Sequence, residues 1–382
     1  MRRRMTDAPS ATTDVLIVGA GIAGASLAAQ LAPYRRVMMI EAEDMPGYHA
    51  TGRSAAFWLE SYGGVQVQPL TAASGPFLAH PDPEFSDHPF LLPRSALIIG
   101  RREERSAVDA FVEEFSGRGV DVARLSTDAL RQQVPGLRPE WTEAALEASC
   151  RDIDVGGLHL AYLKAARKTG AVLATRTALL SARHNGRHGW TVETGQGRIH
   201  AATLVNAAGA WADHVARACD VAPIGIQPYR RTVAQIRFQT AVPASLPLIS
   251  HIGGEFYFKG ESEGRVWLSP HDETASLACD AAPEEMDVAL AIDRLQQVVD
   301  WPIAAVERKW AGLRSFAPDR LPVFGLDPHQ PDFFWCAGQG GFGIQTVPAI
   351  SALLAEQMGG APAPAAIGAI DARPFSPLRF SG

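Results

Sequence analysis

The stretch VLIVGAGIAGASLAAQLAPYRRVMMIEAED, residues 15–44, decides the fold. An apolar, β-branched run predicts a buried strand over residues 14–19, and an Ala- and Leu-rich run predicts a helix over residues 22–32. A second apolar run predicts a strand over residues 37–41. Because strand, helix and strand follow one another within about 30 residues, the stretch is typical of a βαβ unit with two parallel strands.

Three glycines in the pattern GxGxxG form the turn between the first strand and the helix. Gly19 permits the tight turn, Gly21 lets a pyrophosphate approach the backbone, and Gly24 lets the helix pack closely on the strand. Glu41 ends the second strand, where a carboxylate accepts hydrogen bonds from an adenosine ribose. A turn that serves only helix packing is the alternative interpretation. The predicted dinucleotide site comprises Gly19, Gly21, Ile22, Ala23, Gly24, Glu41 and Ala42.

Later glycine-rich segments favour FAD over NAD as the dinucleotide. An NAD dehydrogenase usually repeats its βαβ units promptly, whereas residues 46–56 read PGYHATGRSAA, a loop of small residues. The segment LVNAAGAW follows at residues 204–211, and GQGGFGIQT follows at residues 338–346. Separated glycine-rich segments that meet one ligand suit a long, extended dinucleotide such as FAD.

Composition excludes several classes of function. The 382 residues carry a net charge of -6 without a basic stripe, so nucleic acid is not expected as a partner. The 4 cysteines lie far apart without a CxxC pair, and the 11 histidines show no metal-ligand spacing, so no disulfide framework and no metal site are expected. No apolar run reaches the roughly 20 residues that span a bilayer. The sequence therefore predicts a cytoplasmic protein without a membrane span.

Motifs along nearly the whole chain occur in one order: IVGAGIAGAS, PGYHATGRSAA, LTAAS, HPFLLPR, LVNAAGAW, QPYRR, FYFK, WAGLRSF and GQGGFGIQT. In this combination the chain resembles the D-amino acid oxidase/glycine oxidase family of flavoproteins, and within it the bacterial FAD-dependent D-arginine dehydrogenases. The resemblance implies oxidative deamination of a D-amino acid. A hydride would pass from Cα to flavin N5, and the imino acid would be hydrolysed to a 2-oxo acid and ammonia.

The resemblance also implies two discontinuous domains. We expect a Rossmann-like α/β FAD-binding domain of glutathione-reductase type, and an α+β substrate domain built on a mostly antiparallel sheet. Residues 1–13 are basic and then polar, and we interpret them as a disordered leader. The FAD-binding domain is expected to comprise residues 14–65, 150–222 and 311–360, the substrate domain residues 66–149 and 223–310, and the C-terminal tail residues 361–382.

By resemblance, Arg314 and Arg231 bind the substrate carboxylate, because a planar guanidinium grips a carboxylate in a bidentate manner. Arg230 takes the place of Arg231 if the strand register differs by one residue, because neighbouring residues point to opposite faces. Tyr257 would form a pocket wall, and Tyr62 would act as a lid. The carbonyl of Gly341 would accept a hydrogen bond from the substrate ammonium, and Gln345 would bond the substrate or order the loop.

The remaining residues that the resemblance assigns to FAD come from the glycine-rich segments and their neighbours. They are His49, Arg53, Ser54, Ala55, Ala56, Ala178, Ala207, Ala208, Gly209, Trp211, Gly312, Arg314, Gly340, Gly341, Gly343, Ile344, Gln345 and Thr346.

The chain departs from the D-arginine enzymes at positions that face the substrate side chain. Ala96 stands where they carry an acidic residue, and Phe57 stands where they carry a histidine; Leu248 and Ser250 lie on a strand near the expected pocket. A cationic side chain would lose its buried counter-charge. We therefore expect apolar or aromatic D-amino acids as substrates, with Glu60 as the residue able to restore a preference for cations.

Two further absences concern the flavin. The sarcosine-oxidase branch uses a lysine near the flavin to react with oxygen and links its flavin to a cysteine; neither residue occurs in the comparable GRVWLSP and WAGLRSF. We therefore expect noncovalent FAD, slow reaction with oxygen and a quinone or carrier as electron acceptor. A monomer or weak dimer is expected.

Two alternatives stay open. The first is an oxidase of N-methyl or secondary amino acids or of 2-hydroxy acids, similar to sarcosine and glycine oxidases. The second is a flavin-binding accessory protein without a substrate. The two arginines argue against the second, because a buried guanidinium without an anionic guest is costly.

Overall fold

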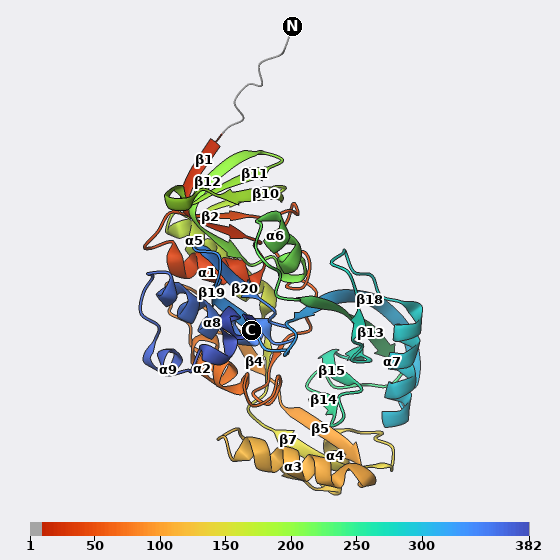
Figure 1. The fold of residues 1–382 in the computed structure, drawn as a ribbon. Coiled ribbons are helices and arrows are strands. Elements are labelled where there is room, and N and C mark those ends of the chain that lie inside the picture. Colours follow the sequence, from red (N-terminus) through yellow and green to blue (C-terminus); the bar gives the residue numbers. More distant parts are fainter. Residues whose placement is uncertain (1–9, 382) are drawn as a thin grey trace.

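A computed structural model describes residues 10–381. Within these residues, the strands form one eight-stranded sheet, one nine-stranded sheet and one three-stranded sheet (Figure 1). The eight-stranded sheet and its helices occupy the upper left of Figure 1, and the nine-stranded sheet extends to the lower right. The three-stranded sheet consists of β3 (Phe57–Trp58), β4 (Leu91–Pro93) and β8 (Arg151–Ile153).

The eight-stranded sheet is built around the predicted βαβ unit. Strand β1 pairs in parallel with β2 on one side and with β12 on the other. Side chains alternate along β1, so Val15 and Ile17 belong to one apolar core and Leu16 and Val18 to another on the opposite face. The strands are β1 (Ser10–Val18), β2 (Val37–Ile40), β9 (Val172–Ala174), β10 (Leu179–His184), β11 (Trp190–Thr194), β12 (Gly197–Asn206), β19 (Val323–Leu326) and β20 (Phe333–Ala337).

The nine-stranded sheet carries the residues expected to bind the substrate. Its longest pairing joins β13 and β18, which run antiparallel; most other pairings are antiparallel too, except that β14 and β5 are parallel. The strands are β5 (Ala96–Arg101), β6 (Val122–Leu125), β7 (Trp141–Glu147), β13 (Gln227–Phe238), β14 (Leu248–His251), β15 (Tyr257–Ser262), β16 (Arg265–Ser269), β17 (Thr274–Ala275) and β18 (Ile303–Phe316).

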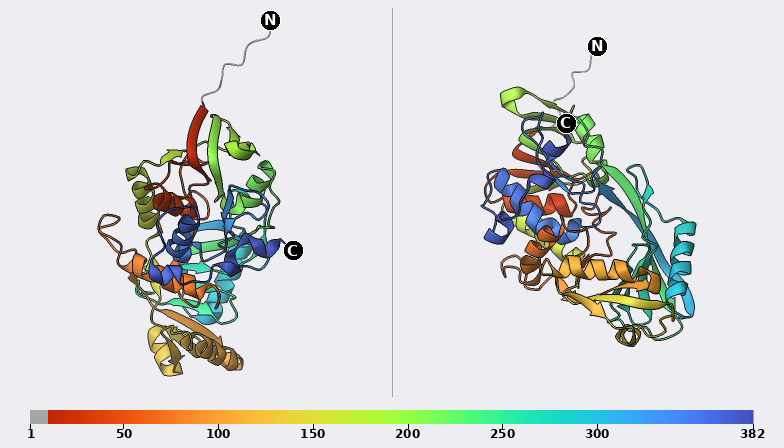
Figure 2. Two further views of the ribbon diagram at one scale, coloured as in Figure 1. Left: turned by 60° about the vertical axis from the view of Figure 1, so that its left-hand side comes forward. Right: turned by 60° about the horizontal axis from the view of Figure 1, so that its bottom comes forward.

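Helices cover both sheets, as the two further views show (Figure 2). Helices α1, α5 and α8 pack on one face of the eight-stranded sheet, and α7 packs on β13 and β16 of the other sheet. The α-helices are α1 (Ile22–Leu31), α2 (Gln68–Ala79), α3 (Arg105–Ser116), α4 (Thr127–Gln133), α5 (Val155–Lys168), α6 (Ala212–Ala218), α7 (Glu285–Val298), α8 (Gly343–Gln357) and α9 (Ala365–Gly368). None of the helices in residues 10–381 is long and apolar enough to cross a bilayer.

The topology confirms the predicted fold class and corrects two boundaries. Strand β1 begins at Ser10, so the predicted leader is too long; residues 1–9 lie outside the described residues. The expected boundary between residues 310 and 311 falls inside β18, which pairs with β13 along its whole length. Helix α8 begins at Gly343, so the end of GQGGFGIQT forms its first turn.

Candidate active site

The glycine-rich turn has the geometry that its three glycines predict. Gly19 has a φ of +102°, and a Cβ on it would lie 2.5 Å from the carbonyl oxygen of Ala207. A Cβ on Gly24 would overlap the carbonyl oxygen of Gly19, so only glycine lets α1 approach the turn. A Cβ on Gly21 would lie 3.2 Å from the hydroxyl of Thr51. The turn therefore leads directly into the N-terminus of α1, where backbone N–H groups suit a phosphate.

A cavity of about 430 Å³ opens beside this turn. Its wall includes the turn, the loop of residues 47–55, Glu41, and residues of β13 and β18. The carboxylate of Glu41 accepts hydrogen bonds from the backbone N–H of Ala20 (2.9 Å) and of Glu43 (3.1 Å). These bonds hold the carboxylate at the end of β2, where it reaches the wall of the cavity.

Most of the predicted FAD residues line this one cavity although they are far apart in the sequence. These residues are Gly19, Gly21, Ile22, Ala23, Glu41, Ala42, His49, Arg53, Ser54, Ala55, Ala178, Ala207, Ala208, Gly209, Trp211, Gly312, Arg314, Gly340, Gly341, Gly343 and Ile344.

The other predicted FAD residues lie elsewhere. Gly24 packs behind the turn, and Ala56 lines a second cavity beside Lys259. Thr346 is fully buried, and its hydroxyl donates to the carbonyl of Phe342, the residue that precedes α8 (2.8 Å). The structure therefore does not bring Ala56 and Thr346 to the wall of the large cavity, because Thr346 is buried within α8 and Ala56 lines the second cavity.

Thr51, Thr177 and Glu43 also line the cavity, and the sequence pattern did not single them out. The hydroxyl of Thr51 accepts a hydrogen bond from the backbone N–H of Ile22 (3.0 Å), so it reaches the first turn of α1. The Nε2 of His49 lies 2.9 Å from Glu43, and its ring packs against Trp211 at 4.5 Å between centroids. Polar residues of the loop after β2 therefore face the same space as the glycine-rich turn.

The register of β13 and β18 decides which of two adjacent arginines reaches the cavity. Arg231 lies opposite Gly312, and Arg314 lies opposite Tyr229, two residues further along. Because the spacing is two residues, Arg231 and Arg314 point to the same face, and both line the cavity. Arg230 points to the other face and binds Asp287 of α7 at 2.9 Å. Arg231 is therefore the arginine of QPYRR that faces the site.

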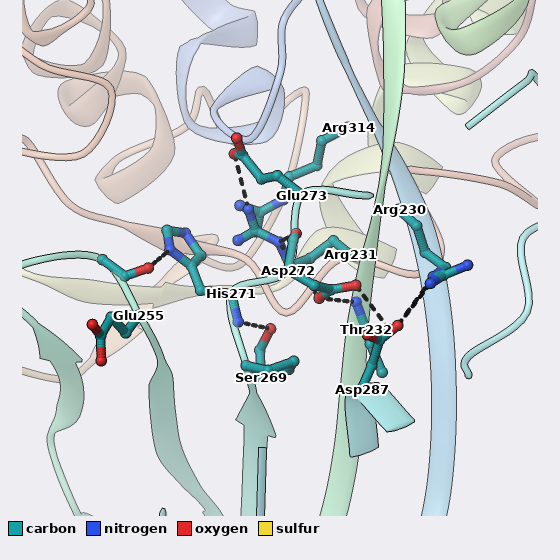
Figure 3. Close-up of polar contacts among 12 residues, drawn as sticks. Arg230, Arg231, Thr232, Glu255, Ser269, His271, Asp272, Glu273, Asp287 and Arg314 are labelled. Atoms are coloured by element: carbon teal, nitrogen blue, oxygen red, sulfur yellow. Dashed lines mark hydrogen bonds and ion pairs between the residues drawn. The ribbon is translucent and has the colours of Figure 1, made fainter. Parts of the chain in front are cut away.

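The two guanidiniums differ in their partners (Figure 3). Arg231 is 4% exposed; its Nε donates to the carbonyl of Asp272 (2.7 Å), its Nη2 donates to Glu273 (3.1 Å), and its Nη1 has no partner. Burial, together with the charge of Arg314, lowers the pKa of Arg231 to about 10. Arg314 donates to the hydroxyl of Tyr62 (2.5 Å). The pair therefore presents unused donors toward one space.

The glycine-rich segment before α8 packs against Tyr62 and Arg314. A Cβ on Gly341 would overlap the Tyr62 hydroxyl and would lie 2.9 Å from Nη1 of Arg314. Gln345 is 2% exposed, and its amide binds the backbone of Leu59 (3.2 Å) and of Tyr62 (3.1 Å). Of the two roles expected for Gln345, the structure supports ordering the segment of Tyr62; the side chain does not line the cavity.

Apolar side chains surround Tyr257 next to the arginine pair. Phe57 lies 5.5 Å from Tyr62 and 6.0 Å from Tyr257, measured between ring centroids. Ala96 and Leu248 are opposite each other on β5 and β14, are fully buried, and belong to the same apolar cluster as Tyr257. Glu60 is turned toward Gln68, whose amide donates to its carboxylate at 3.0 Å. Burial raises the pKa of Glu60.

No sequence pattern assigned a role to two basic side chains near the site, the half-buried His271 and the buried Lys259. His271 has a φ of 55°, and its pKa is lowered to about 3 by burial and by the charges of Arg231 and Arg314, so its ring is neutral. Lys259 on β15 pairs across from Trp267 of GRVWLSP and binds Asp152 at 2.6 Å. The absence of lysine from GRVWLSP therefore does not leave this part of the sheet without a buried lysine.

These observations fit FAD as the ligand of the cavity. The turn at α1, the carboxylate of Glu41 and the close-packed backbone of Gly340 and Gly341 line one continuous space. Among residues 10–381, no group of three or more His, Cys, Asp or Glu side chains is arranged to hold a metal ion.

Known proteins resemble the chain along most of its length. It is 27% identical over 239 residues to hydrogen cyanide synthase subunit HcnC of Pseudomonas aeruginosa, covering 60% of the chain and 54% of that protein. It is 25% identical over 360 residues to the mitochondrial dimethylglycine dehydrogenase of Rattus norvegicus, covering 87% of the chain and 41% of that protein. The chain thus spans about half, or less, of the length of these relatives.

A solved structure shares the fold. The L-proline dehydrogenase of P. horikoshii superposes with a TM-score of 0.84 at 20% sequence identity, covering 98% of this chain and 99% of that one. The sequence profile described as "DAO: FAD dependent oxidoreductase" matches residues 14–357. FAD is the cofactor that this profile names, and the cavity has the residues to bind it. The chain therefore belongs to the DAO family of FAD-dependent oxidoreductases.

Proposed function

We propose that the protein oxidises D-amino acids with apolar or aromatic side chains and acts as a dehydrogenase. The observation that supports this proposal is the pair Arg231 and Arg314, which line one cavity beside an apolar cluster that contains Tyr257. The product would be an imino acid, which water converts to a 2-oxo acid and ammonia. A quinone or carrier would take up the electrons.

The arginine pair binds the substrate carboxylate in this proposal. Nη1 of Arg231 is buried without a partner, and the guanidinium of Arg314 bonds only the Tyr62 hydroxyl among the described residues. A carboxylate that accepts from both guanidiniums satisfies these donors and gains charge-assisted hydrogen bonds. Tyr62 would then lie beside the bound carboxylate, because its hydroxyl accepts a hydrogen bond from Arg314.

The same charges act on the substrate amine. Two nearby cations disfavour an ammonium and lower its pKa, so the amine is held in the neutral form that can lose hydride from Cα. His271 adds no charge, because it stays neutral beside the pair. When bound, FAD supplies the acceptor of the two electrons that leave the substrate.

The apolar cluster selects the side chain. Tyr257 is the member of this cluster that lines the cavity, and Phe57, Ala96 and Leu248 are apolar side chains of the same cluster outside the cavity wall. A guanidinium or ammonium placed there would be desolvated, which costs several kcal/mol. The carboxyl group of Glu147, opposite Ala96, already accepts from the backbone of Glu60 and Ser61, and burial raises its pKa to about 7. We therefore place D-arginine among poor substrates.

A second candidate is the oxidation of secondary or tertiary amino acids. The names of the similar proteins favour it, because one acts on dimethylglycine and another on L-proline. Such substrates also carry one carboxylate, so the arginine pair serves both candidates.

Anaerobic flavin bleaching distinguishes the candidates. The holoprotein is mixed with D-phenylalanine, D-leucine, D-arginine, L-phenylalanine, proline, N,N-dimethylglycine and sarcosine, and absorbance near 450 nm is followed. The proposal expects fast bleaching by D-phenylalanine and D-leucine, at least tenfold slower bleaching by D-arginine, and little hydrogen peroxide when air is admitted. Fast bleaching only by proline or the N-methylated compounds would replace the proposal with the second candidate.

Adjacent arginines on β13 provide a matched test of the clamp. Arg231→Lys and Arg314→Lys should each lower kcat/KM about 100-fold, because a point charge replaces a planar fork at a buried carboxylate. Arg230→Lys should leave kcat/KM within about threefold of the wild-type value, because Arg230 faces α7. Equal losses at Arg230 and Arg231 would contradict the assignment.

A further inference from the structure

Arg231 already has a carboxylate partner inside the protein. Nη2 of Arg231 donates to Oε1 of Glu273 at 3.1 Å, and Asp272 lies 4.0 Å from Nε (Figure 3). Asp272 is itself held by the backbone N–H of Thr232 at 2.7 Å. The sequence-based view that both guanidiniums lack a counter-charge until a guest binds is therefore wrong for Arg231.

Glu273 is fixed from the outer side as well. Both of its carboxylate oxygens accept from Nη2 of Arg320 at 2.8 Å. The guanidinium of Arg320 in turn lies 3.9 Å from the centre of the Phe316 ring. The carboxylate thus bridges a buried arginine and a surface arginine; its side chain is 34% exposed and lies beside Arg231, behind the wall of the cavity.

The charge balance leaves room for one more anion. Three guanidiniums, of Arg231, Arg314 and Arg320, share two internal carboxylates, of Asp272 and Glu273, so one positive charge is left, and His271 is neutral. Among residues 10–381, no carboxylate lies within ion-pair distance of Arg314. One guest carboxylate therefore completes the coordination of Arg314 and of the free Nη1 of Arg231, whereas a second guest anion meets Glu273 and Asp272 without a free cation.

We propose that Glu273 is a specificity-determining residue that restricts the site to guests with a single carboxylate and excludes dicarboxylic amino acids. The proposal rests on the proposed function, because it assumes that Arg231 and Arg314 bind the guest carboxylate. Glu273 acts in two ways. It orients Arg231 so that Nη1 stays available, and it supplies the negative charge that repels a second carboxylate.

Non-reacting acids test this proposal without turnover. Succinate is propionate with a second carboxylate in place of one methyl hydrogen, and the binding of both acids to the holoprotein is measured by calorimetry and by the change of the flavin spectrum. The wild-type protein should bind succinate at least tenfold more weakly than propionate. Glu273→Gln keeps an oxygen for the Arg231 hydrogen bond but removes the charge, so it should shift the succinate-to-propionate affinity ratio at least tenfold toward succinate.

Glu284→Gln is the matched control, because Glu284 pairs with Arg230 on the opposite face of β13. It should leave the ratio unchanged. The proposal is overturned if wild-type protein binds succinate as tightly as propionate, or if Glu273→Gln weakens both acids equally, which would show a structural role only. The wild-type comparison decides the matter even if the variant does not fold.

The test also separates this proposal from the proposed function. A protein that binds propionate and discriminates against succinate, but is bleached by no amino acid, would retain the charge selection and lose the proposed reaction. Bleaching by D-phenylalanine together with tight succinate binding would support the proposed reaction and contradict the role of Glu273 in excluding a second carboxylate.

Discussion

Glu147 is a fully buried acid that holds the backbone next to Tyr62. Its Oε1 accepts from the backbone N–H of Glu60 (2.8 Å) and of Ser61 (3.4 Å), while its Oε2 is buried without a partner. Burial raises the pKa of Glu147 to about 7, and the neighbouring charge of Glu60 adds to the shift. The segment that carries the proposed lid is thus anchored on a group that titrates near neutrality.

The raised pKa of Glu147 makes the free energy of unfolding depend on pH. The pKa of Glu147 is higher in the folded protein than in the unfolded chain, so the folded protein holds the extra proton between about pH 4.5 and pH 7. The stability due to that proton is present below pH 4.5 and is lost as pH rises through 7. The loss amounts to about 3 kcal/mol at most. Glu147→Gln should therefore gain stability relative to the wild type as pH rises from 5 to 8, measured by urea unfolding.

Glu143, four residues earlier on β7, provides a control of opposite sign. Its burial raises the pKa, but hydrogen bonds from Arg124 and Arg105 outweigh burial and lower it. Glu143→Gln should lose stability relative to the wild type at pH 8. Parallel pH profiles for the wild type and Glu147→Gln would show that Glu147 is ionised in the fold like an exposed acid.

At the scale of elements, the approach of α1 to β1 depends on one missing side chain. A Cβ on Gly24 would overlap the backbone oxygen of Gly19, and neither backbone atom can move without displacing the turn. Gly24→Ala should cost about 3 kcal/mol, at the upper end for overpacking, and weaken FAD binding at least tenfold. Flavin fluorescence released on dilution measures the second effect.

Gly195 is the matched site, because a Cβ there meets nothing within 4 Å and its φ is not in the left-handed range. Gly195→Ala should leave the free energy of unfolding and the affinity for FAD unchanged within experimental error. Retention of FAD by Gly24→Ala at wild-type affinity would mean that the turn adapts to a side chain.

Across the whole molecule, the proposed FAD cavity joins the two large sheets. Val18 and Glu41 line the cavity from the eight-stranded sheet and its loops, and Arg231 and Leu313 line it from the nine-stranded sheet. A ligand that binds only the folded protein stabilises it by mass action, by about 2.7 kcal/mol at 100 times its dissociation constant. Removal of FAD should therefore lower the unfolding midpoint, and added FAD should restore it in a concentration-dependent way.

Limited proteolysis tests whether FAD stabilises the wall of the cavity itself. The loop of residues 47–55 contributes much of the wall, so it should be cut faster in the apoprotein than in the holoprotein. An unfolding midpoint that does not respond to FAD would contradict the assignment of the cavity.

Local patterns predicted the parts of the fold that depend on neighbouring residues. The βαβ unit follows from hydrophobic periods and from glycine spacing, so its strand and helix bounds differ by only a few residues from those of β1, α1 and β2. The short strands β5 and β7 escaped notice, because they lie among Pro-rich loops and are defined by pairing with distant partners.

Motif resemblance predicted which side chains meet, but not their partners. Arg231, Arg314, Tyr257 and Gly341 line one cavity, as their motifs suggested. The choice between Arg230 and Arg231 needed the register of β13 with β18. The bond from Arg231 to Glu273 spans 42 residues, and no local pattern indicates that a chain reversal brings them together.

The wall of the large cavity is assembled from residues as early as Val18 and as late as Ile350. During synthesis the ribosome releases the dinucleotide turn long before it releases the segment that closes the other side. Nascent protein can therefore enclose its redox group only once nearly the whole chain has emerged, and a truncated translation product would be left with an open, colourless half-pocket.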